Sequence, residues 1–371
     1  MAAIKKTGPK KPAKKVAGAK KASKTSKSAS KKPILKRAPH NPIISPKEYF
    51  WESKATFNPA AFEANGKIHL IYRAIGNDDS SVLGYASSLD GHNIQERLPY
   101  FIYRRCNDFD KADIENIPFF YASGGGWNGG CEDPRLTLLD GRVYLLYTAF
   151  DGWGSVRIAM TSISLEDFIA KRFNWKEPVL ISPPGQIHKN WVLFPEKIKG
   201  PATAGASKYA ILHSVSPKIM IDYFKSLDEL DGKNFIHSVH RDSPLWKMRD
   251  RLIRGVGPTP IKTKYGWLIL YHKMEPHDTH RYKLWAMILD SEDPTKILYD
   301  TKEPILEPDL WYENEGYKEG VIYSCGAVVK DDELFVYYGG ADKVSCVAVA
   351  RLDLFLKEII KNKVSKLKKK E

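Results

Sequence analysis

Short stretches of alternating side chains recur along most of this chain. Residues 67–74, KIHLIYRA, and 142–149, RVYLLYTA, alternate aliphatic and aromatic side chains with others and include a tyrosine near the end. Alternation over this length predicts β-strands, in which successive side chains point to opposite faces. The dipeptides Asn65-Gly66, Asp140-Gly141 and Asp331-Asp332 lie between apolar runs, as hairpin turns require. The pattern therefore predicts antiparallel hairpins.

These strands belong to a pattern that occurs five times. Each copy has a short motif often ending in proline, a few apolar residues, a turn and an alternating strand, as in FNPAAFEANGKIHLIYRA and EDPRLTLLDGRVYLLYTA. The matching positions are separated by 75, 61, 63 and 67 residues and are Pro59, Pro134, Pro195, Pro258 and Cys325. A second alternating segment follows each copy. Units of about 60 residues with this content are typical of β-propeller blades.

The sequence thus predicts an all-β protein with one five-bladed β-propeller over residues 41–356. A β-sandwich would also contain short alternating strands, but it does not predict five copies of one internal order.

The charge of the chain is concentrated at its ends. Residues 1–38 contain 13 Lys, one Arg and no acidic residue, and the remaining chain has 44 basic and 44 acidic residues. With almost no large apolar side chain, residues 1–40 are expected to be a disordered basic tail. Residues 1–38 could then bind nucleic acid or another polyanion weakly, or simply act as a solubilising extension. Residues 357–371 hold seven Lys and are expected to form a basic helix or tail.

Other features exclude several classes of protein. The four cysteines show no CxxC spacing, and neither a secretory segment nor an apolar run of 18 residues is present. We therefore expect a cytoplasmic protein with reduced thiols and no membrane contact. The ten histidines include no HExxH or similar cluster, so no metal site is expected.

A glycine-rich segment carries the most suggestive chemistry. Residues 124–135 read GGGWNGGCEDPR and place Glu132 and Asp133 immediately before a predicted strand. Glycines let the backbone approach a ligand, and a carboxylate at the mouth of a strand is well placed for proton transfer. We expect an active-site loop here. The alternative is a tight turn in which Asp133 caps the backbone ahead of Pro134.

The body from about Asn41 to Leu356 resembles glycoside hydrolase family 130, whose members are five-bladed propellers acting on β-mannosides as phosphorylases or hydrolases. The resemblance runs, in family order and spacing, through NPIISP, FNPAAF, IYRAIG, CEDPR, VLFPEKI, GPTPIK, GWLILYH, EPILEP and YYGGAD. It implies that Asp133 is the general acid of an inverting reaction, protonating the glycosidic oxygen through a sugar hydroxyl while phosphate attacks the anomeric carbon.

The resemblance also implies binding residues. Those expected at the sugar are Asn58, Arg73, Glu132, Arg135 and Asp342, and those expected at phosphate or an acceptor are Lys189, Asn190, His213, Arg254, Tyr271 and His272. Trp127 and Trp153 lie in loops beside the EDPR motif and offer aromatic faces on which a pyranose stacks. The expected partner is an oligosaccharide. No cofactor is expected, with inorganic phosphate as the only co-substrate considered.

Two departures from the family pattern concern phosphate. Ser214 follows His213 where phosphorylases usually carry an arginine, and Ile253 stands where they carry a lysine, with Arg254 beside it. Fewer phosphate donors favour water as the acceptor, so hydrolysis is slightly preferred over phosphorolysis at this point. A hydrolase would need a second carboxylate as base, and the candidates are Glu196, Asp242, Asp250, Glu313 and Glu315.

Two functions without catalysis are also considered. The first is an inactive propeller that binds a glycan or a protein partner. The second is a nucleic-acid-associated scaffold that acts through the basic tail.

Overall fold

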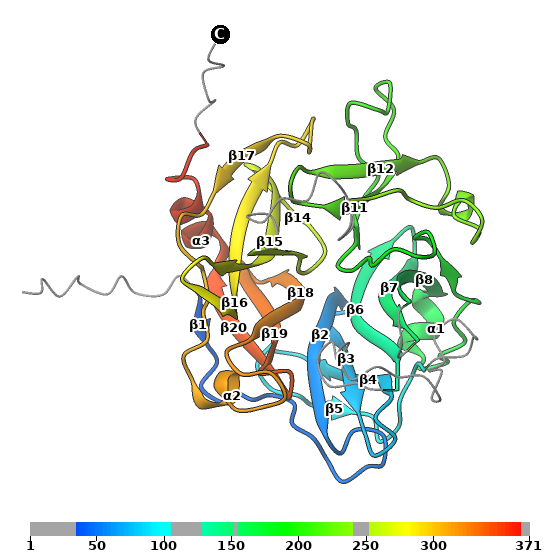
Figure 1. Ribbon diagram of the computed structural model, residues 1–371, viewed down its shortest axis with the longest axis vertical. Helices are drawn as coiled ribbons and strands as arrows, with labels where there is room; N and C mark the ends of the chain where they lie inside the picture. The colour runs from blue at the N-terminus through cyan, green and yellow to red at the C-terminus, as the bar shows by residue number, and fades with distance from the viewer. Residues whose placement is uncertain (1–34, 105–127, 152–154, 240–251, 365–371) are drawn as a thin grey trace, which may run out of the picture. The chain divides into compact units, whose positions relative to one another are not determined.

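The structure is a computed structural model that describes residues 35–104, 128–151, 155–239 and 252–364. All of these residues belong to one compact unit, Pro33–Glu371. Figure 1 shows that they form mainly β-strands with few helices, so the all-β prediction is confirmed. No helix within these ranges is long and apolar enough to cross a membrane.

The strands form antiparallel groups in chain order. The first group comprises β2 (Ala55–Ala64), β3 (Lys67–Ile75), β4 (Ser81–Ser88) and β5 (Glu96–Arg97), and the second comprises β6 (Gly130–Leu139), β7 (Arg142–Phe150), β8 (Val156–Ser164) and β9 (Val179–Leu180). A single parallel pair, Ser81 with Gly130, joins them into one sheet. Helix α1 (Leu165–Ile169) follows β8, and the Ser164 side chain caps its N-terminus.

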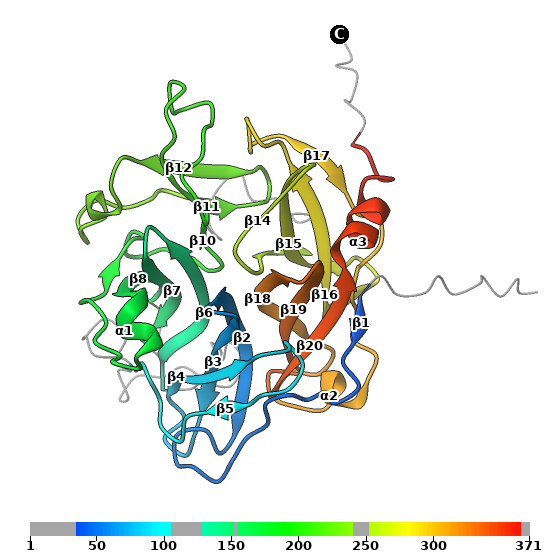
Figure 2. The ribbon, with the colours of Figure 1, turned by 180° about the vertical axis from the view of Figure 1, so that it is seen from behind.

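Three further groups complete the unit (Figures 1 and 2). The third comprises β10 (Val192–Leu193), β11 (Tyr209–Ser214) and β12 (Met220–Phe224), followed by the 3₁₀ helix η3 (Leu227–Glu229). The fourth comprises β13 (Ile253–Val256), β14 (Ile261–Thr263), β15 (Gly266–Glu275), β16 (Asp278–Leu289) and β17 (Ile297–Asp300). The fifth comprises β18 (Ile322–Lys330), β19 (Glu333–Gly340), β20 (Val344–Arg351) and β1 (Lys36–Arg37), with α2 (Trp311–Asn314) before it and α3 (Leu352–Ile359) after it.

The predicted hairpin turns are confirmed. Asn65-Gly66 joins β2 to β3, Asp140-Gly141 joins β6 to β7, and Asp331-Asp332 joins β18 to β19. Both residues of each pair have a positive φ, between 49° and 73°. Turns with two such residues match the twist of the strands they connect, and Asn, Asp and Gly adopt this conformation most readily.

Five hydrophobic clusters hold the groups together. Four of them join consecutive groups, and the remaining one joins the fifth group to the first, with Tyr337 and Phe335 packed against Tyr72. Because successive side chains of a strand point to opposite faces, one strand can contribute to two clusters. Leu145 of β7 faces the first group, whereas Leu146 faces the third. Both faces of β7 are therefore largely buried, and most of its side chains are apolar.

At both ends of the chain, the folded unit includes residues that the sequence analysis placed in the tails. A tail was expected up to residue 40, but Leu35 is buried and β1 pairs with β20. Arg37 forms an ion pair of 2.7 Å with the buried carboxylate of Glu313. At the other end, α3 begins before residue 357 and packs into the core, because an apolar face of this helix buries Phe355 and Ile359.

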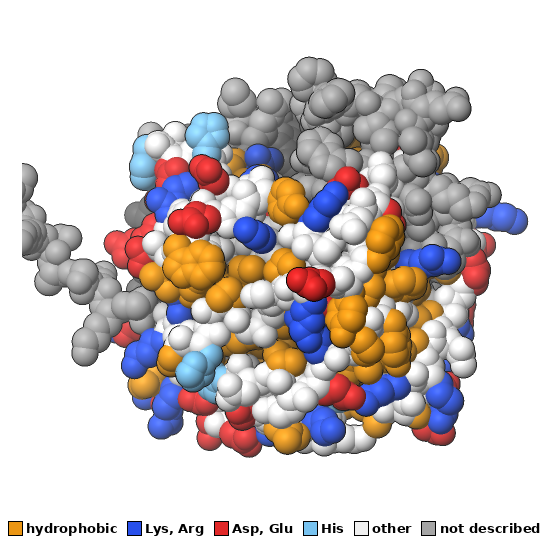
Figure 3. All heavy atoms as spheres, turned by 90° about the horizontal axis from the view of Figure 1, so that it is seen from below, with side chains coloured by type: hydrophobic (Ala, Val, Ile, Leu, Met, Phe, Trp, Pro, Cys, Tyr) orange, Lys and Arg blue, Asp and Glu red, His pale blue; other side chains and the backbone are white. Residues whose placement is uncertain are grey.

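Away from these ends, the surface is mixed in charge. Figure 3 shows one face on which acidic and basic side chains are interspersed. This agrees with the near-neutral composition of the chain outside its tails.

Candidate active site

The acidic pair lies inside a strand rather than in a loop. Glu132 and Asp133 belong to β6, whose pairing with β7 shifts register between Glu132 and Arg135. Strand β2 has a matching shift across Asn58-Pro59, and β18 has one at Cys325. A β-bulge re-aims the side chain of the extra residue. The repeated motif therefore brings Asn58 and Asp133 together, where β2 contacts β6 and β18 (Figure 1).

Four side chains of the site project from unusual backbone. Asn58, Asp133, Asn190 and Asp342 have φ values of 49°, 48°, 66° and 52°. Asn and Asp tolerate this left-handed conformation better than other side chains, and residues held in it tend to cluster at functional sites. Strand β19 approaches Asn58 so closely that a Cβ at Gly339 would lie 2.1 Å from its Oδ1. Glycine is required there.

The Asp133 carboxylate is held through one oxygen. Its Oδ1 accepts hydrogen bonds from Asn58 Nδ2 at 2.8 Å and from Arg73 Nη1 at 3.3 Å. Arg73 Nη2 donates to Glu132 Oε1 at 2.6 Å, and Lys189 Nζ lies 3.5 Å from Glu132 Oε2. Within the described residues, Oδ2 of Asp133 has no hydrogen-bond partner, and 8% of this side chain is exposed. The free oxygen is available to a ligand. Glu132 is fully buried and holds these cations instead of facing a substrate.

Arg135 positions this carboxylate instead of binding substrate, which corrects the expectation for it. Its Nη1 donates to the Asp133 backbone oxygen at 2.6 Å, its Nη2 to Asn190 Oδ1 at 2.8 Å, and its Nε to the Gly257 backbone oxygen at 3.3 Å. The side chain is buried. Its donors are therefore engaged by the protein.

His272 lies beside this network as a neutral ring. It stacks on Tyr323 with 4.1 Å between ring centroids, and its Nε2 accepts the Ser324 N–H at 2.8 Å. Burial, followed by the nearby Arg135, lowers the pKa of His272 to about 3. His272 is therefore no cation for phosphate. Tyr323 in turn donates to Asn190 Oδ1, and the sequence analysis missed it. Its position, two residues before the bulge residue Cys325, was the only signal.

Asp342 is a second carboxylate at the site. It is 5% exposed, and no residue in the described ranges forms a hydrogen bond or ion pair with its side chain. Burial raises the pKa of Asp342 to about 6, with Asp133 adding to the effect and Lys318 and Arg73 opposing it. A buried, unpaired carboxylate is suited to accept hydrogen bonds from sugar hydroxyls.

The pKa of Asp133 is shifted the other way. Burial opposes ionisation, but Arg73, Arg135 and Lys189 and the hydrogen bond from Asn58 outweigh it and lower the pKa. Asp133 is thus ionised at neutral pH in the ligand-free site. Two carboxylates with pKa values moved apart are a common feature of catalytic sites.

Several expected residues lie elsewhere. Tyr271 points opposite to its neighbour His272, packs between the third and fourth groups and donates to Asp300 at 2.9 Å, so it is not part of the site. His213 is buried against Trp191, with 5.6 Å between ring centroids, and has no hydrogen bond to the site. Trp127 and Trp153 lie outside the described residues.

The two departures from the family pattern have clear structural consequences. Ser214 Oγ donates to the backbone oxygens of Ser216 and Lys218, so it stabilises a turn. Ile253 packs against the core cluster between the third and fourth groups. Neither reaches the site.

The described candidates for a catalytic base are engaged elsewhere or exposed. Glu196 pairs with Lys262 at the surface, and Glu313 pairs with Arg37. Glu315 is exposed, and Asp242 and Asp250 lie outside the described residues.

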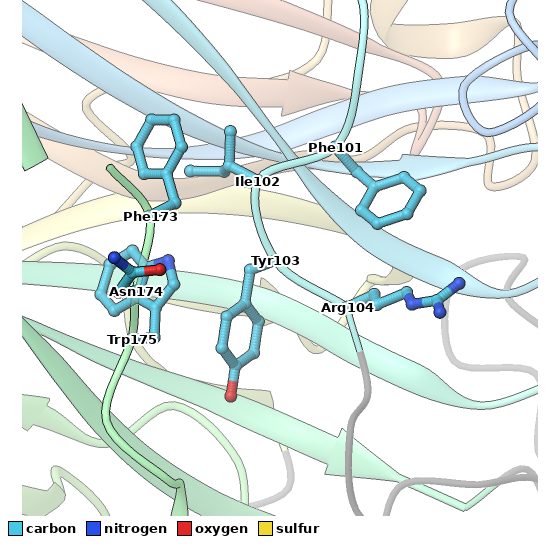
Figure 4. A pocket seen from close by; sticks show the side chains of 7 residues that line it. All are labelled: Phe101, Ile102, Tyr103, Arg104, Phe173, Asn174 and Trp175. Carbon is cyan, nitrogen blue, oxygen red and sulfur yellow. The ribbon is translucent and has the colours of Figure 1, made fainter. Parts of the chain in front are cut away.

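A cleft of about 290 Å³ lies away from this site. Residues 101–104 and residues 173–175 line it, and Figure 4 shows their side chains. It shares no residue with the network around Asp133, so it does not contribute to that chemistry.

Comparison with known proteins identifies the family. Residues 25–361 match the family described as beta-1,4-mannooligosaccharide phosphorylase. The chain is a member of glycoside hydrolase family 130. A 1,2-beta-oligomannan phosphorylase from Thermoanaerobacter sp. (strain X514) is 38% identical over 86% of this chain and 97% of its own length. A beta-1,2-mannobiose phosphorylase from the same strain is 35% identical over 85% of this chain and 96% of its own.

Solved structures agree on the fold of this family 130 member. A putative glycoside hydrolase from Bacteroides ovatus, 24% identical, superposes with a TM-score of 0.66 over 85% of this chain and 96% of its own. The family model and the two relatives confirm the resemblance drawn from the sequence motifs.

Proposed function

We propose that this protein cleaves β-1,2-linked mannosides by phosphorolysis and releases α-D-mannose 1-phosphate. Membership of family 130 supports action on mannosides, and both relatives described above are named as phosphorylases of β-1,2-linked substrates. The slight preference for water that the sequence suggested has no support from these relatives.

The observation that carries this proposal is the state of Asp133. One oxygen is fixed by Asn58 and Arg73, and the other faces the small exposed part of the site. A carboxylate fixed in this way presents a proton in one direction, as a general acid must. Of the described residues considered as the base of a hydrolase, Glu196 and Glu313 are paired with cations and Glu315 is exposed, whereas phosphate needs no such base.

In the proposed reaction, one bond forms and one bond breaks at the anomeric carbon. A phosphate oxygen forms a bond to the anomeric carbon from the face opposite the leaving group, while the bond from that carbon to the glycosidic oxygen breaks. The leaving oxygen takes a proton that originates on Asp133 Oδ2. Hydrogen phosphate gives up one proton on becoming the mannosyl phosphate, which restores the proton of Asp133, so no proton is gained or lost overall. Attack from the opposite face inverts a β-mannoside to an α-mannosyl phosphate.

The charge of phosphate also affects the pKa of Asp133. Arg73, Arg135 and Lys189 lower the pKa of Asp133 in the ligand-free site. A phosphate anion bound in the site adds negative charge, which opposes the effect of these cations and raises this pKa. Phosphate binding therefore prepares the acid as well as supplying the nucleophile.

We also propose that the five strand groups form a closed five-bladed propeller. Five strand groups, each joined to the next by a hydrophobic cluster and the last joined to the first, are what a closed five-bladed propeller requires. A ring would bring Asn58, Asp133 and Asn190, which come from three consecutive groups, to its centre.

The test is an incubation of the purified protein with mannobioses of defined linkage, with and without inorganic phosphate. We expect α-mannose 1-phosphate from the β-1,2-linked substrate only when phosphate is present. Free mannose as the main product, at a rate independent of phosphate, would refute phosphorolysis.

A further inference from the structure

Two cations at the edge of the site share one aromatic ring. The guanidinium carbon of Arg254 lies 5.1 Å from the ring centre of Tyr282, and Lys318 Nζ lies 4.0 Å from it. The two charges are therefore at most about 9 Å apart, which is the sum of these distances. They come from different groups, β13 and the segment before β18.

The backbone explains why Arg254 points there. The pairing of β13 with β15 shifts register between Ile253 and Gly255, so Arg254 is the extra residue of a bulge. This frees it from strict alternation with Ile253, which faces the core. Asn190 Nδ2 donates to the Arg254 backbone oxygen and so ties this bulge to the network around Arg135.

Lys318 is fixed in a similar way. Its N–H donates to the Ala341 backbone oxygen at 3.1 Å, next to Asp342. Tyr282 N–H donates to the Gly320 backbone oxygen at 2.9 Å, which aligns β16 with the segment carrying Lys318. No sequence motif singles out this lysine.

Neither cation of this pair forms a direct ion pair within the described residues, although Lys318 acts on Asp342 at longer range. Among the described residues, no carboxylate lies within 4.0 Å of the cationic groups of Arg254 or Lys318. Contact with an aromatic face stabilises each cation modestly, but it does not cancel their mutual repulsion. An anion between them would do so, and a guanidinium fork beside an ammonium suits phosphate.

We propose that Arg254 and Lys318, which both contact the ring of Tyr282, form the phosphate subsite of this protein. They would replace the arginine and the lysine that phosphorylases of the family usually carry at the positions of Ser214 and Ile253. This inference rests on the proposed function for the role of phosphate as nucleophile. The anion itself is inferred from two neighbouring cations that have no ion-pair partner among the described residues. A neutral sugar would not require them.

The experiment compares Arg254→Gln and Lys318→Gln with the unmodified protein in steady-state phosphorolysis. A charge-assisted contact typically contributes enough that each variant should raise the KM for phosphate by about 10- to 100-fold. The KM for the mannoside should change by less than about twofold. Arg254→Lys should recover part of the loss, since it keeps the charge but not the fork.

Lys273→Gln is the matched control. Lys273 also contacts an aromatic ring, with Nζ 4.2 Å from the ring centre of Trp285, but it lies on the other side of the sheet from the site. Its removal should leave both KM values unchanged.

Direct titration of each protein with inorganic phosphate, without sugar, separates this inference from the proposed function. If the unmodified protein makes only free mannose but Arg254→Gln and Lys318→Gln weaken phosphate binding, the subsite stands and phosphorolysis fails. If mannose 1-phosphate is made and both variants keep the original KM for phosphate, the subsite is refuted. An equal rise in the KM for mannoside would also refute it, by showing a general disturbance of the site.

Discussion

Replacing Asp342 with asparagine should stabilise the protein while impairing its activity. Asp342 is buried and has no hydrogen-bond partner among the described residues, and its pKa is raised from 3.8 to about 6. The folded protein thus resists ionisation of this group more than the unfolded chain does. Asparagine keeps the size of the side chain and removes the charge, so the cost of burying that charge disappears.

The magnitude follows from the pKa shift. A raised carboxyl pKa means that the cost is fully present above about pH 6, decreases as the pH falls, and vanishes below the unfolded value of about 3.8. At 1.36 kcal/mol per pKa unit, the shift corresponds to roughly 3 kcal/mol at pH 7. Asp342→Asn should therefore be more stable than the unmodified protein by up to this amount at pH 7, and equally stable near pH 4.

Urea unfolding at both pH values measures this difference. Asp331→Asn is the control, because Asp331 is exposed and an Asn fits its turn; its stability should change by no more than about 0.5 kcal/mol at either pH. The affinity of Asp342→Asn for mannoside should fall, since a carboxylate that accepts sugar hydroxyls is lost. A variant that is less stable at pH 7, or a difference that does not depend on pH, would refute this reasoning.

Three further outcomes are expected. Asp133→Asn should fold normally and lose about 10²- to 10⁴-fold in kcat, measured as mannose 1-phosphate release, and activity within a few fold of the original would remove Asp133 from the acid role. Arg37→Ala should lower the free energy of unfolding by about 3 kcal/mol because it leaves the buried Glu313 without its ion pair, and an unchanged urea midpoint would contradict this. Deleting residues 1–32 should change neither turnover nor stability, since the described contacts of the fold begin at Leu35, but should abolish salt-dependent retention on a polyanion column; lost turnover would show that the tail matters to the site.

Much of the site could be anticipated, but its geometry could not. The motifs identified Asn58, Arg73, Asp133 and Asn190, which the structure joins in one hydrogen-bonded network. Roles within that network depend on what each side chain contacts. Arg73 and Arg135 both match motifs expected at the sugar, yet both are buried and donate to the protein, Arg73 to Ser81, Glu132 and Asp133 among others.

Lys318 was not predicted from the sequence. It belongs to no repeated motif, and its relation to Arg254 exists only because β16 lies beside the segment before β18. Tyr271 was assigned to the site from a motif, although alternation along β15 directs it to the core.

The sequence by itself determined the strands, the hairpin turns and the five repeated units. These depend on side-chain alternation and on residues such as Asn65-Gly66 that favour one local backbone conformation. Tertiary structure alone decided where the chain joins the fold and what the polar residues do. The basic composition before residue 40 conceals β1, because its pairing with β20 is supplied by a strand more than 300 residues away. The opposite pKa shifts of Asp133 and Asp342 likewise arise from burial and from charges brought together by folding, which no local pattern contains.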